Sequence, residues 1–308
     1  MNRPLLCLIL GSLLLLGILP REAAGQPAPR AVRVNGVELH YVEQGSGVPI
    51  IFVHGGLEDF RAWTGQVDAF SQQYRALAYS RRYNYPNSGV AFGSSYSAAV
   101  DAEDLAAFIK KLDLAPAHIV GASYGAYVAL LLAAKHPELV RSLVLAEPPV
   151  LRWLAKIEGG QPLYAEFMRV VWGPATRGFR QGNEAGVTAA VNGFGELGYS
   201  GTDQKMTFAD LPPEYKSVIL ENAAEWKALT MSRDAFPPLS FGEVRRIEAP
   251  TLLLSGQRSL KLAGLIDGNL DHLLPHAQRL ILAGATHEMW NEYPQECRNA
   301  AIAFMDKH

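Results

Sequence analysis

Short apolar runs alternate with amphipathic stretches along most of this chain. The runs are rich in Val, Ile and Leu, as expected of strands that are buried on both faces of a parallel sheet. Between the runs, apolar residues recur at helical spacing, as in the stretch from Leu105 to Leu112, where acidic residues take the other face. The pattern predicts eight strands, at 31–34, 37–43, 49–53, 75–79, 117–120, 142–146, 251–254 and 278–282.

Strands that alternate with helices imply a doubly wound sheet with helices on both faces. The first two strands are joined by Asn35-Gly36, a strong signal for a two-residue hairpin, and should therefore pair antiparallel. The remaining strands are separated by helices and should run parallel. The expected fold class is α/β, with a mostly parallel eight-stranded sheet. Helices are expected at 61–70, around 105–112, at 126–136 and 260–274, and from 294 onward.

The alternation is interrupted from residue 148 to residue 244, where the pattern is helical or irregular and rich in aromatic residues and glycine. Ligands bind to sheets of this kind beyond the carboxyl ends of the strands. We therefore expect 148–244 to be an inserted helical cap, or lid, over those ends. The core would then comprise 31–147 and 245–308. One apolar stripe at helical spacing within the cap comprises Tyr215, Ile219, Ala223 and Trp226.

The beginning of the chain has the pattern of a secretory signal peptide. Arg3 is followed by an apolar run from Leu5 to Leu19 and then by small residues that end at Gly25. We expect residues 1–25 to be this leader and the protein to be secreted or periplasmic. The apolar run is shorter than the ~20 residues of a membrane-spanning helix, although an uncleaved anchor is the alternative. Without the leader only Cys297 remains, so no intramolecular disulfide is expected.

Composition narrows the classes of partner. The net charge of the whole chain is −2 and 49% of its residues are hydrophobic, which suits a globular core and does not favour a nucleic-acid partner. No Cys/His spacing resembles a metal site, and no glycine-rich phosphate loop follows a strand. We therefore expect no cofactor and no metal. The sequence contains no signal for an oligomeric state.

The segment Gly121-Ala122-Ser123-Tyr124-Gly125 follows a predicted strand and precedes a predicted helix. Strand, Gly-x-Ser-x-Gly and helix together are typical of a nucleophile elbow. The turn strains the serine backbone, and only small residues fit two positions on either side of it. The serine hydroxyl would then stand at the carboxyl end of the sheet, near a helix N-terminus that favours negative charge. The segment predicts that Ser123 is a nucleophile; the alternative is a glycine-rich turn with an incidental serine.

With these pieces the chain resembles the α/β-hydrolase family over residues 31–308. The matching pieces are His54-Gly55-Gly56 after the third predicted strand, the elbow, and His287 after the last strand. The resemblance implies that Ser123 attacks the substrate and that His287 is its base. It also implies an oxyanion hole formed by the backbone N–H groups of Gly56 and Tyr124. His54 would order this loop rather than move protons.

The acid of the triad departs from the family pattern. The family usually places an aspartate after the seventh strand, where this chain has Ser259. Some members have the acid after the sixth strand instead, and Glu147 stands there. The order Ser123, Glu147, His287 is the order of the family. We therefore expect Glu147 to be the acid, with Asp267 or Asp271, or a dyad without an acid, as alternatives.

Two further groups of residues bear on the substrate. Arg81-Arg82 ends the fourth predicted strand and is expected to be a structural or solvated pair, although it could place a cation near the pocket for an acidic substrate. Aromatic residues of the cap suggest an apolar pocket roof, in which most of them would simply be core. These residues are Trp153, Tyr164, Phe167, Trp172, Phe194, Phe208 and Trp226.

The leading hypothesis is a carboxylesterase-like serine hydrolase that cleaves an ester, lactone or related acyl bond of a small molecule through an acyl-enzyme. A nucleophilic aspartate would have indicated haloalkane or epoxide chemistry, and the serine argues against both. The same triad also serves carbon–carbon bond hydrolysis and cofactor-free perhydrolysis, which stay open as alternatives. A third hypothesis is a ligand-binding protein on a hydrolase scaffold with weak or no turnover.

Overall fold

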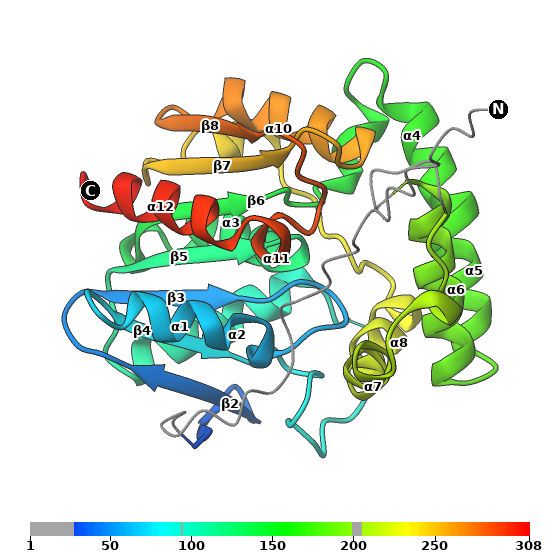
Figure 1. Cartoon of the computed structure of the whole chain (residues 1–308), viewed down its shortest axis with the longest axis horizontal. Helices are drawn as coiled ribbons and strands as arrows, with labels where there is room; N and C mark the ends of the chain where they lie inside the picture. Colours follow the sequence, from blue (N-terminus) through cyan, green and yellow to red (C-terminus); the bar gives the residue numbers. More distant parts are fainter. Residues whose placement is uncertain (1–27, 94, 199–204) are drawn as a thin grey trace, which may run out of the picture.

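An eight-stranded sheet forms the centre of the protein in a computed structural model that describes residues 28–93, 95–198 and 205–308 (Figure 1). The predicted leader, residues 1–25, lies outside the described residues. All eight predicted strands are present at the expected places, with small differences at their ends. They are β1 (Arg30–Val34), β2 (Val37–Gln44), β3 (Pro49–Val53), β4 (Arg75–Tyr79), β5 (Ala117–Ala122), β6 (Val140–Ala146), β7 (Thr251–Gly256) and β8 (Ala277–Leu282).

The sheet is mostly parallel, as predicted. Its strand order is β1-β2-β4-β3-β5-β6-β7-β8. β1 and β2 form the expected antiparallel hairpin, in which Val34 pairs with Val37 and both turn residues, Asn35 and Gly36, have positive φ. β2 is also antiparallel to β4, whereas all later neighbours pair in parallel. The carboxyl ends of the six parallel strands, β3 to β8, therefore lie at one edge of the sheet.

Helices cover both faces of the sheet (Figure 1). One face packs against α1 (Thr64–Phe70) and α12 (Pro294–Met305), and the other packs against α2 (Ala98–Lys111), α3 (Tyr124–Lys135) and α10 (Lys261–Leu273). α3 is buried almost throughout, because its residues from Tyr124 to Ala133 lie between the sheet and its neighbours. Short helical segments are Phe60–Trp63, Pro137–Leu139, Leu151–Ala155, Phe208–Asp210 and α11 (Met289–Glu292).

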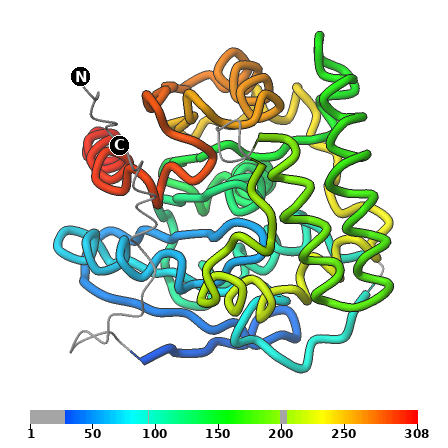
Figure 2. Tube along the Cα trace, turned by 45° about the vertical axis from the view of Figure 1, so that its right-hand side comes forward, coloured from blue at the N-terminus to red at the C-terminus, as the bar shows by residue number. Residues whose placement is uncertain are grey.

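The described part of the segment 148–244 is mainly helical and stands beyond the ends toward which the strand arrows point in Figure 1; Figure 2 shows its green and yellow-green helices at the right. Its helices are α4 (Gly160–Phe167), a π-helical segment (Met168–Trp172), α5 (Gly173–Phe179), α6 (Asn183–Glu196), α7 (Pro213–Glu221), α8 (Ala223–Met231) and α9 (Phe241–Val244). We refer to these helices as the cap helices. Their apolar residues join the same hydrophobic cluster as α2, α3 and α10, so they pack directly onto the core.

The prediction of one continuous apolar stripe on a single cap helix is wrong. The chain leaves helical geometry at Asn222, so Tyr215 and Ile219 lie on α7 whereas Ala223 and Trp226 lie on α8. The buried side chain of Asn222 explains the break. Its Nδ2 donates to Asp59 Oδ2 at 2.7 Å, and its Oδ1 accepts from the backbone N–H of Tyr85 at 2.8 Å. These contacts with the core fix Asn222 and turn the chain there.

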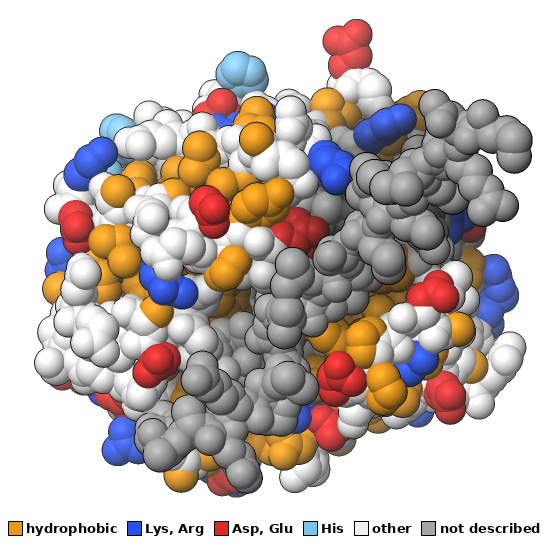
Figure 3. All heavy atoms as spheres, viewed as in Figure 1, with side chains coloured by type: hydrophobic (Ala, Val, Ile, Leu, Met, Phe, Trp, Pro, Cys, Tyr) orange, Lys and Arg blue, Asp and Glu red, His pale blue; other side chains and the backbone are white. Residues whose placement is uncertain are grey.

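The surface shows no concentration of one charge on the face of Figure 3. Acidic, basic and hydrophobic side chains are interspersed among the residues that are coloured there. Within the described ranges, none of the helices has both the length and the apolar character needed to cross a membrane.

Candidate active site

Ser123 lies in a strained turn between β5 and α3. Its φ of 50° and ψ of −122° belong to a region that residues with a side chain avoid. The flanking glycines permit this turn: a Cβ on Gly125 would lie 2.2 Å from the carbonyl oxygen of Val53, and one on Gly121 would lie 2.7 Å from the nitrogen of Ala126. This is the local geometry of a nucleophile elbow. Ser123 itself is partly exposed although the residues around it are mostly buried.

The loop after β3 passes beside this serine. A Cβ on Gly55 would lie 3.5 Å from Ser123 Cβ. His54, fully buried, holds the loop: its Nε2 accepts from the backbone N–H of Arg81 at 3.0 Å, and its Nδ1 lies 2.9 Å from Gly55 O. Because a carbonyl only accepts, Nδ1 must carry the proton, and the ring is neutral. Burial, reinforced by the charge of Arg81, lowers the pKa of His54 well below its ordinary value. This geometry suits the predicted ordering role.

The N–H groups of the two predicted oxyanion donors are not used by the bonds that fix the elbow and the loop. Tyr124 is the first residue of α3, so its N–H has no acceptor within the helix. In the loop, the N–H of Gly55 donates to Glu58 Oε2 at 2.8 Å and that of Leu57 donates to Glu225 Oε2 at 2.9 Å. Among the described residues, the N–H of Gly56 between them has no such partner.

His287 and Glu147 form a hydrogen-bonded pair. Glu147 follows β6, is 2% exposed and has a positive φ of 51°. Its Oε2 accepts from His287 Nδ1, and from Ser259 Oγ at 2.5 Å, while its Oε1 accepts from the N–H of Gly256 at 2.8 Å. The serine at the usual position of the family's aspartate therefore binds the carboxylate that contacts the histidine.

The pKa of His287 reflects this pairing. Burial disfavours the imidazolium, but the hydrogen bond and the negative charge of Glu147 outweigh burial and raise the pKa above its ordinary value. The close approach needs glycine at position 256, because a Cβ there would lie 2.4 Å from the carbonyl oxygen of Thr286. An imidazolium formed at His287 would thus be stabilised by a fixed carboxylate.

The two alternative acids occupy other surroundings. Asp267 is fully buried on α10, where its Oδ2 accepts from Ser255 Oγ at 2.6 Å. Burial, together with the charge of Glu147, raises the pKa of Asp267 to about 8. Asp271 is partly exposed near the end of the same helix. The structure therefore brings Glu147, rather than either aspartate, into hydrogen-bond contact with His287.

Glu58 is a residue of the site that the sequence reasoning missed. A Cβ on Gly55 would lie 3.0 Å from Glu58 Oε2 and 3.5 Å from Ser123 Cβ, so the carboxylate and the serine are both close to this glycine. Burial and the negative charge of Glu288 raise the pKa of Glu58 to about 8, although the bond from the Gly55 N–H opposes this. The available signal was a carboxylate two residues after His54-Gly55-Gly56, in the loop that was predicted to lie beside Ser123.

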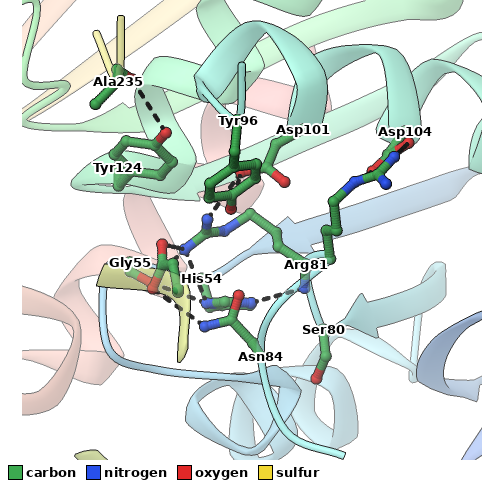
Figure 4. Close-up of polar contacts among 12 residues, drawn as sticks. His54, Gly55, Ser80, Arg81, Asn84, Tyr96, Asp101, Asp104, Tyr124 and Ala235 are labelled. Atoms are coloured by element: carbon green, nitrogen blue, oxygen red, sulfur yellow. Dashed lines mark hydrogen bonds and ion pairs between the residues drawn. The ribbon is translucent and has the colours of Figure 1, made fainter. Parts of the chain in front are cut away.

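A buried polar network lies next to the loop after β3 (Figure 4). The sequence pointed to Arg81 but not to its partners. Arg81, expected to be structural or solvated, is 1% exposed. It pairs with Glu225 of α8 at 2.6 Å and with Asp101 of α2 at 3.1 Å, and it donates to Gly55 O at 2.8 Å. Arg82 pairs separately with Asp104, at 2.8 Å. These two buried carboxylates compensate the charge of Arg81, so its role is structural rather than the binding of an acidic substrate.

Several of the predicted cap aromatics gather near the elbow. The ring of Trp226 lies 5.8 Å from that of Trp172 and 5.7 Å from that of Phe194. Phe236, which was not singled out, connects Trp172 to Tyr124 with ring distances of 5.3 and 5.8 Å. Other aromatics serve local packing, such as Trp153, whose indole donates to Leu239 O, and Phe208, which lies under Lys216. In the part of the chain that the structure describes, no three His, Cys, Asp or Glu side chains gather as a metal site requires.

Comparison with known proteins places this geometry in a family. The sequence pattern of the α/β hydrolase fold matches residues 48–290. The chain is 22% identical over 306 residues to bifunctional epoxide hydrolase 2 of Sus scrofa, covering 88% of this chain. It spans about half, 54%, of the length of that relative.

Solved structures agree on the fold. The carboxylesterase CesB (YbfK) from Bacillus subtilis aligns with a TM-score of 0.71 and 21% identity, over 91% of this chain and 92% of that one. Est816, described as an N-acyl homoserine lactone degrading enzyme, aligns with a TM-score of 0.67 and 22% identity, over 89% and 100%. Because the family pattern spans most of the chain and the sheet order and helical layers agree with it, the chain belongs to the α/β hydrolase fold family.

Proposed function

We propose that this protein is a serine hydrolase that cleaves an ester, lactone or related acyl bond of a small molecule through an acyl-enzyme. The observation that carries the proposal is the combination of a strained, partly exposed Ser123 with a histidine that is held by a buried carboxylate. Strained residues of this kind persist where function requires them. A plain glycine-rich turn would not need the adjacent loop or the His287–Glu147 pair.

In the proposed reaction, Ser123 Oγ attacks the carbonyl carbon and His287 Nε2 takes its proton. Nδ1 of the ring faces Glu147, which stabilises the imidazolium. The carbonyl oxygen becomes negative in the tetrahedral intermediate, and the N–H groups of Gly56 and Tyr124 stabilise it. His287 then protonates the leaving group, and the acyl-enzyme is hydrolysed by a water that the same histidine deprotonates.

Serine at the elbow separates this proposal from epoxide hydrolysis. The relative from Sus scrofa is named for epoxide hydrolysis, a reaction that in this family begins with an aspartate nucleophile, whereas position 123 is serine. The names of the aligned structures, a carboxylesterase and a lactone-degrading enzyme, accord with acyl chemistry. We further propose that 148–244 acts as the cap of the substrate pocket and that residues 1–25 direct export.

A fluorophosphonate probe tests the nucleophile. We expect it to label the wild-type protein at Ser123 and not to label Ser123→Ala, which should remain folded because alanine keeps the Cβ and removes only the hydroxyl. His287→Ala should lose labelling as well, because the hydroxyl then has no base. Ser71→Ala, at an unrelated surface serine, should be labelled like wild type. Absence of labelling in the wild type would favour the binding-protein hypothesis.

A substrate panel then separates the bonds. Aryl esters of graded acyl length, lactones and a dienoic diketone are offered to the purified protein. The proposal predicts turnover of the esters or lactones at rates well above that of the diketone. Preferred cleavage of the diketone would instead indicate carbon–carbon bond hydrolysis on the same residues.

A further inference from the structure

Trp226 of α8 lies directly against the loop that we assign to the oxyanion hole. A Cβ on Gly56 would lie only 2.8 Å from the indole Nε1 of Trp226, so any side chain at position 56 would displace the ring. The nitrogen, rather than a carbon, is the atom of the indole nearest to that Cβ position. This close approach explains why the loop has a second glycine.

The indole N–H has no acceptor among the described residues, although Trp226 is only 7% exposed. A polar group without a partner inside the protein has to take its hydrogen bond from water or from a ligand. The indole nitrogens of Trp63 and Trp290 are also unpaired but fully enclosed, whereas that of Trp226 keeps some accessible surface. The Trp226 N–H is therefore open to an acceptor from outside the protein, such as water or a ligand atom.

The ring is held in place by the residue before it. Glu225 Oε2 accepts from the N–H of Leu57 at 2.9 Å, and Glu225 Oε1 pairs with Arg81 at 2.6 Å. The same guanidinium donates to Gly55 O at 2.8 Å. α8 is thus tied to the residues on both sides of Gly56, once directly and once through Arg81. The aromatic rings of Trp172 and Phe194 support the other side of the indole.

We propose that the Trp226 indole N–H is a third donor of the oxyanion hole, supplied by the cap to the acyl oxygen that the Gly56 N–H also binds. The inference rests on the proposed acyl-transfer function. It means that α8 completes the catalytic site rather than only covering it. A donor that is fixed before the reaction begins stabilises the developing charge without reorganisation.

Trp226→Phe tests the donor, because it keeps an aromatic ring and removes the N–H. We expect kcat for an aryl ester to fall about 10- to 100-fold, within or just below the range seen for loss of one oxyanion donor, with little change in KM. Affinity for an alkyl boronic acid, which forms a negatively charged tetrahedral adduct on Ser123, should fall by a similar factor. The control is Trp63→Phe, which removes an equally unpaired N–H on the other face of the sheet and should leave both values unchanged.

The wild-type protein offers a direct readout. The ¹⁵N–H resonance of the Trp226 indole should move downfield when the boronic acid binds, as a new hydrogen bond requires. The chain has five tryptophans, so the resonance is assigned from Trp226→Phe or, if that variant does not fold, by elimination with the other four.

The possible results distinguish this inference from the proposed function. An adduct that forms without a shift of the Trp226 resonance, or a Trp226→Phe variant with wild-type kcat, overturns the third donor and leaves the serine hydrolase standing. A change confined to KM shows that the ring is only a pocket wall and also overturns it. A wild-type protein that forms no adduct with the boronic acid and no bond with fluorophosphonate overturns the proposed function, and the third donor with it.

Discussion

Backbone strain is concentrated at three residues around the candidate site. Leu57, Ser123 and Glu147 all have positive φ, a conformation that costs about 1–3 kcal/mol for residues with a side chain. Each is held by a specific contact: Leu57 N–H by Glu225, Ser123 N–H by the carbonyl oxygen of Ala146 at 2.7 Å, and Glu147 by the bonds to its carboxylate. The fold tolerates this strain because the contacts over-determine each position.

Replacing Glu147 by Gln should reduce kcat by about 10²–10⁴, because the neutral amide no longer stabilises the imidazolium or fixes its tautomer. The measurement is steady-state kinetics with an aryl ester, supported by circular dichroism. Adding Ser259→Asp to this variant should restore part of the rate, since Ser259 Oγ lies 2.5 Å from the position of the lost carboxylate oxygen. Asp271→Asn should behave like wild type. If Asp271→Asn had a strongly reduced kcat while Glu147→Gln kept the kcat of wild type, Glu147 would not be the acid.

Glu58 should give the reaction an alkaline limit. Activity should rise with pH as His287, whose pKa is raised, loses its proton, and should fall above about 8 as Glu58 ionises beside the oxyanion. Glu58→Gln should abolish the fall at high pH and leave the rise in place, as measured by kcat/KM between about pH 5.5 and 10.

Glu288 provides the matched control for this prediction. Its charge raises the pKa of both Glu58 and His287, so Glu288→Gln should move both limbs to lower pH. Asp59 raises and Arg81 lowers the pKa of Glu58 as well, and both remain in these variants. An alkaline limb that persists unchanged in Glu58→Gln would assign that limb to another group.

At the scale of elements, the cap helices are joined to the rest of the chain by charge as well as by apolar packing. Arg81, two residues beyond the end of β4, links α8, α2 and the loop after β3, and its guanidinium lies 4.8 Å from the ring of Tyr124 at the start of α3. Four elements therefore share one buried cation. Removing one partner of a buried ion pair is costly, because the remaining charge has lost its compensation.

Arg81→Met should therefore lower the free energy of unfolding by about 3–5 kcal/mol, as measured by urea denaturation. The surface pair of Arg169 and Glu196 is the control: both side chains are largely exposed, and Arg169→Ala should cost less than about 1 kcal/mol. Similar losses in the two variants would mean that the buried network does not stabilise the fold.

At the scale of the whole molecule, the sheet order decides which distant residues meet. β3, β5, β6 and β7 are consecutive neighbours and run parallel, so the residues that follow them emerge at one edge. The loop with Gly56, the elbow with Ser123, Glu147 and Ser259 all follow these four strands. The connection after β8 brings His287 to the same edge. A contact such as Arg81–Glu225 joins residues 144 positions apart in the chain.

The stability of the whole protein should depend on pH through Asp267. Its folded pKa of about 8 lies above the ~3.9 of an unfolded aspartate, so the folded state binds the proton more tightly. The free energy of unfolding should therefore fall as pH rises from about 4 to 8, by at most about 1.4 kcal/mol per pH unit from this group. Asp267→Asn resembles the protonated form and should show a stability advantage over wild type that grows across this range in thermal melts. A constant difference between the two proteins would contradict the shift.

The sequence by itself determined the strands, most of the core helices, the elbow and the place of His287. These features are local. The alternation of apolar runs indicates which segments are buried, and Gly121 and Gly125 indicate a turn in which a larger residue would clash with the backbone. Such patterns can be read from the sequence because each segment must pair its own backbone N–H and C=O groups and bury its own apolar face.

Tertiary structure alone decided which side chains became partners. Glu147 and Asp267 were both candidates for the acid of the triad. The register of β6 against β7 places Glu147 where it accepts hydrogen bonds from the Gly256 N–H and from His287. Asp267, on α10, is instead buried against Ser255. The position of Glu58 close to Ser123 and the contact of Trp226 with Gly56 likewise have no signature in spacing or composition. Such contacts join segments far apart in the chain, and their geometry is set by packing rather than by the residues next to each partner.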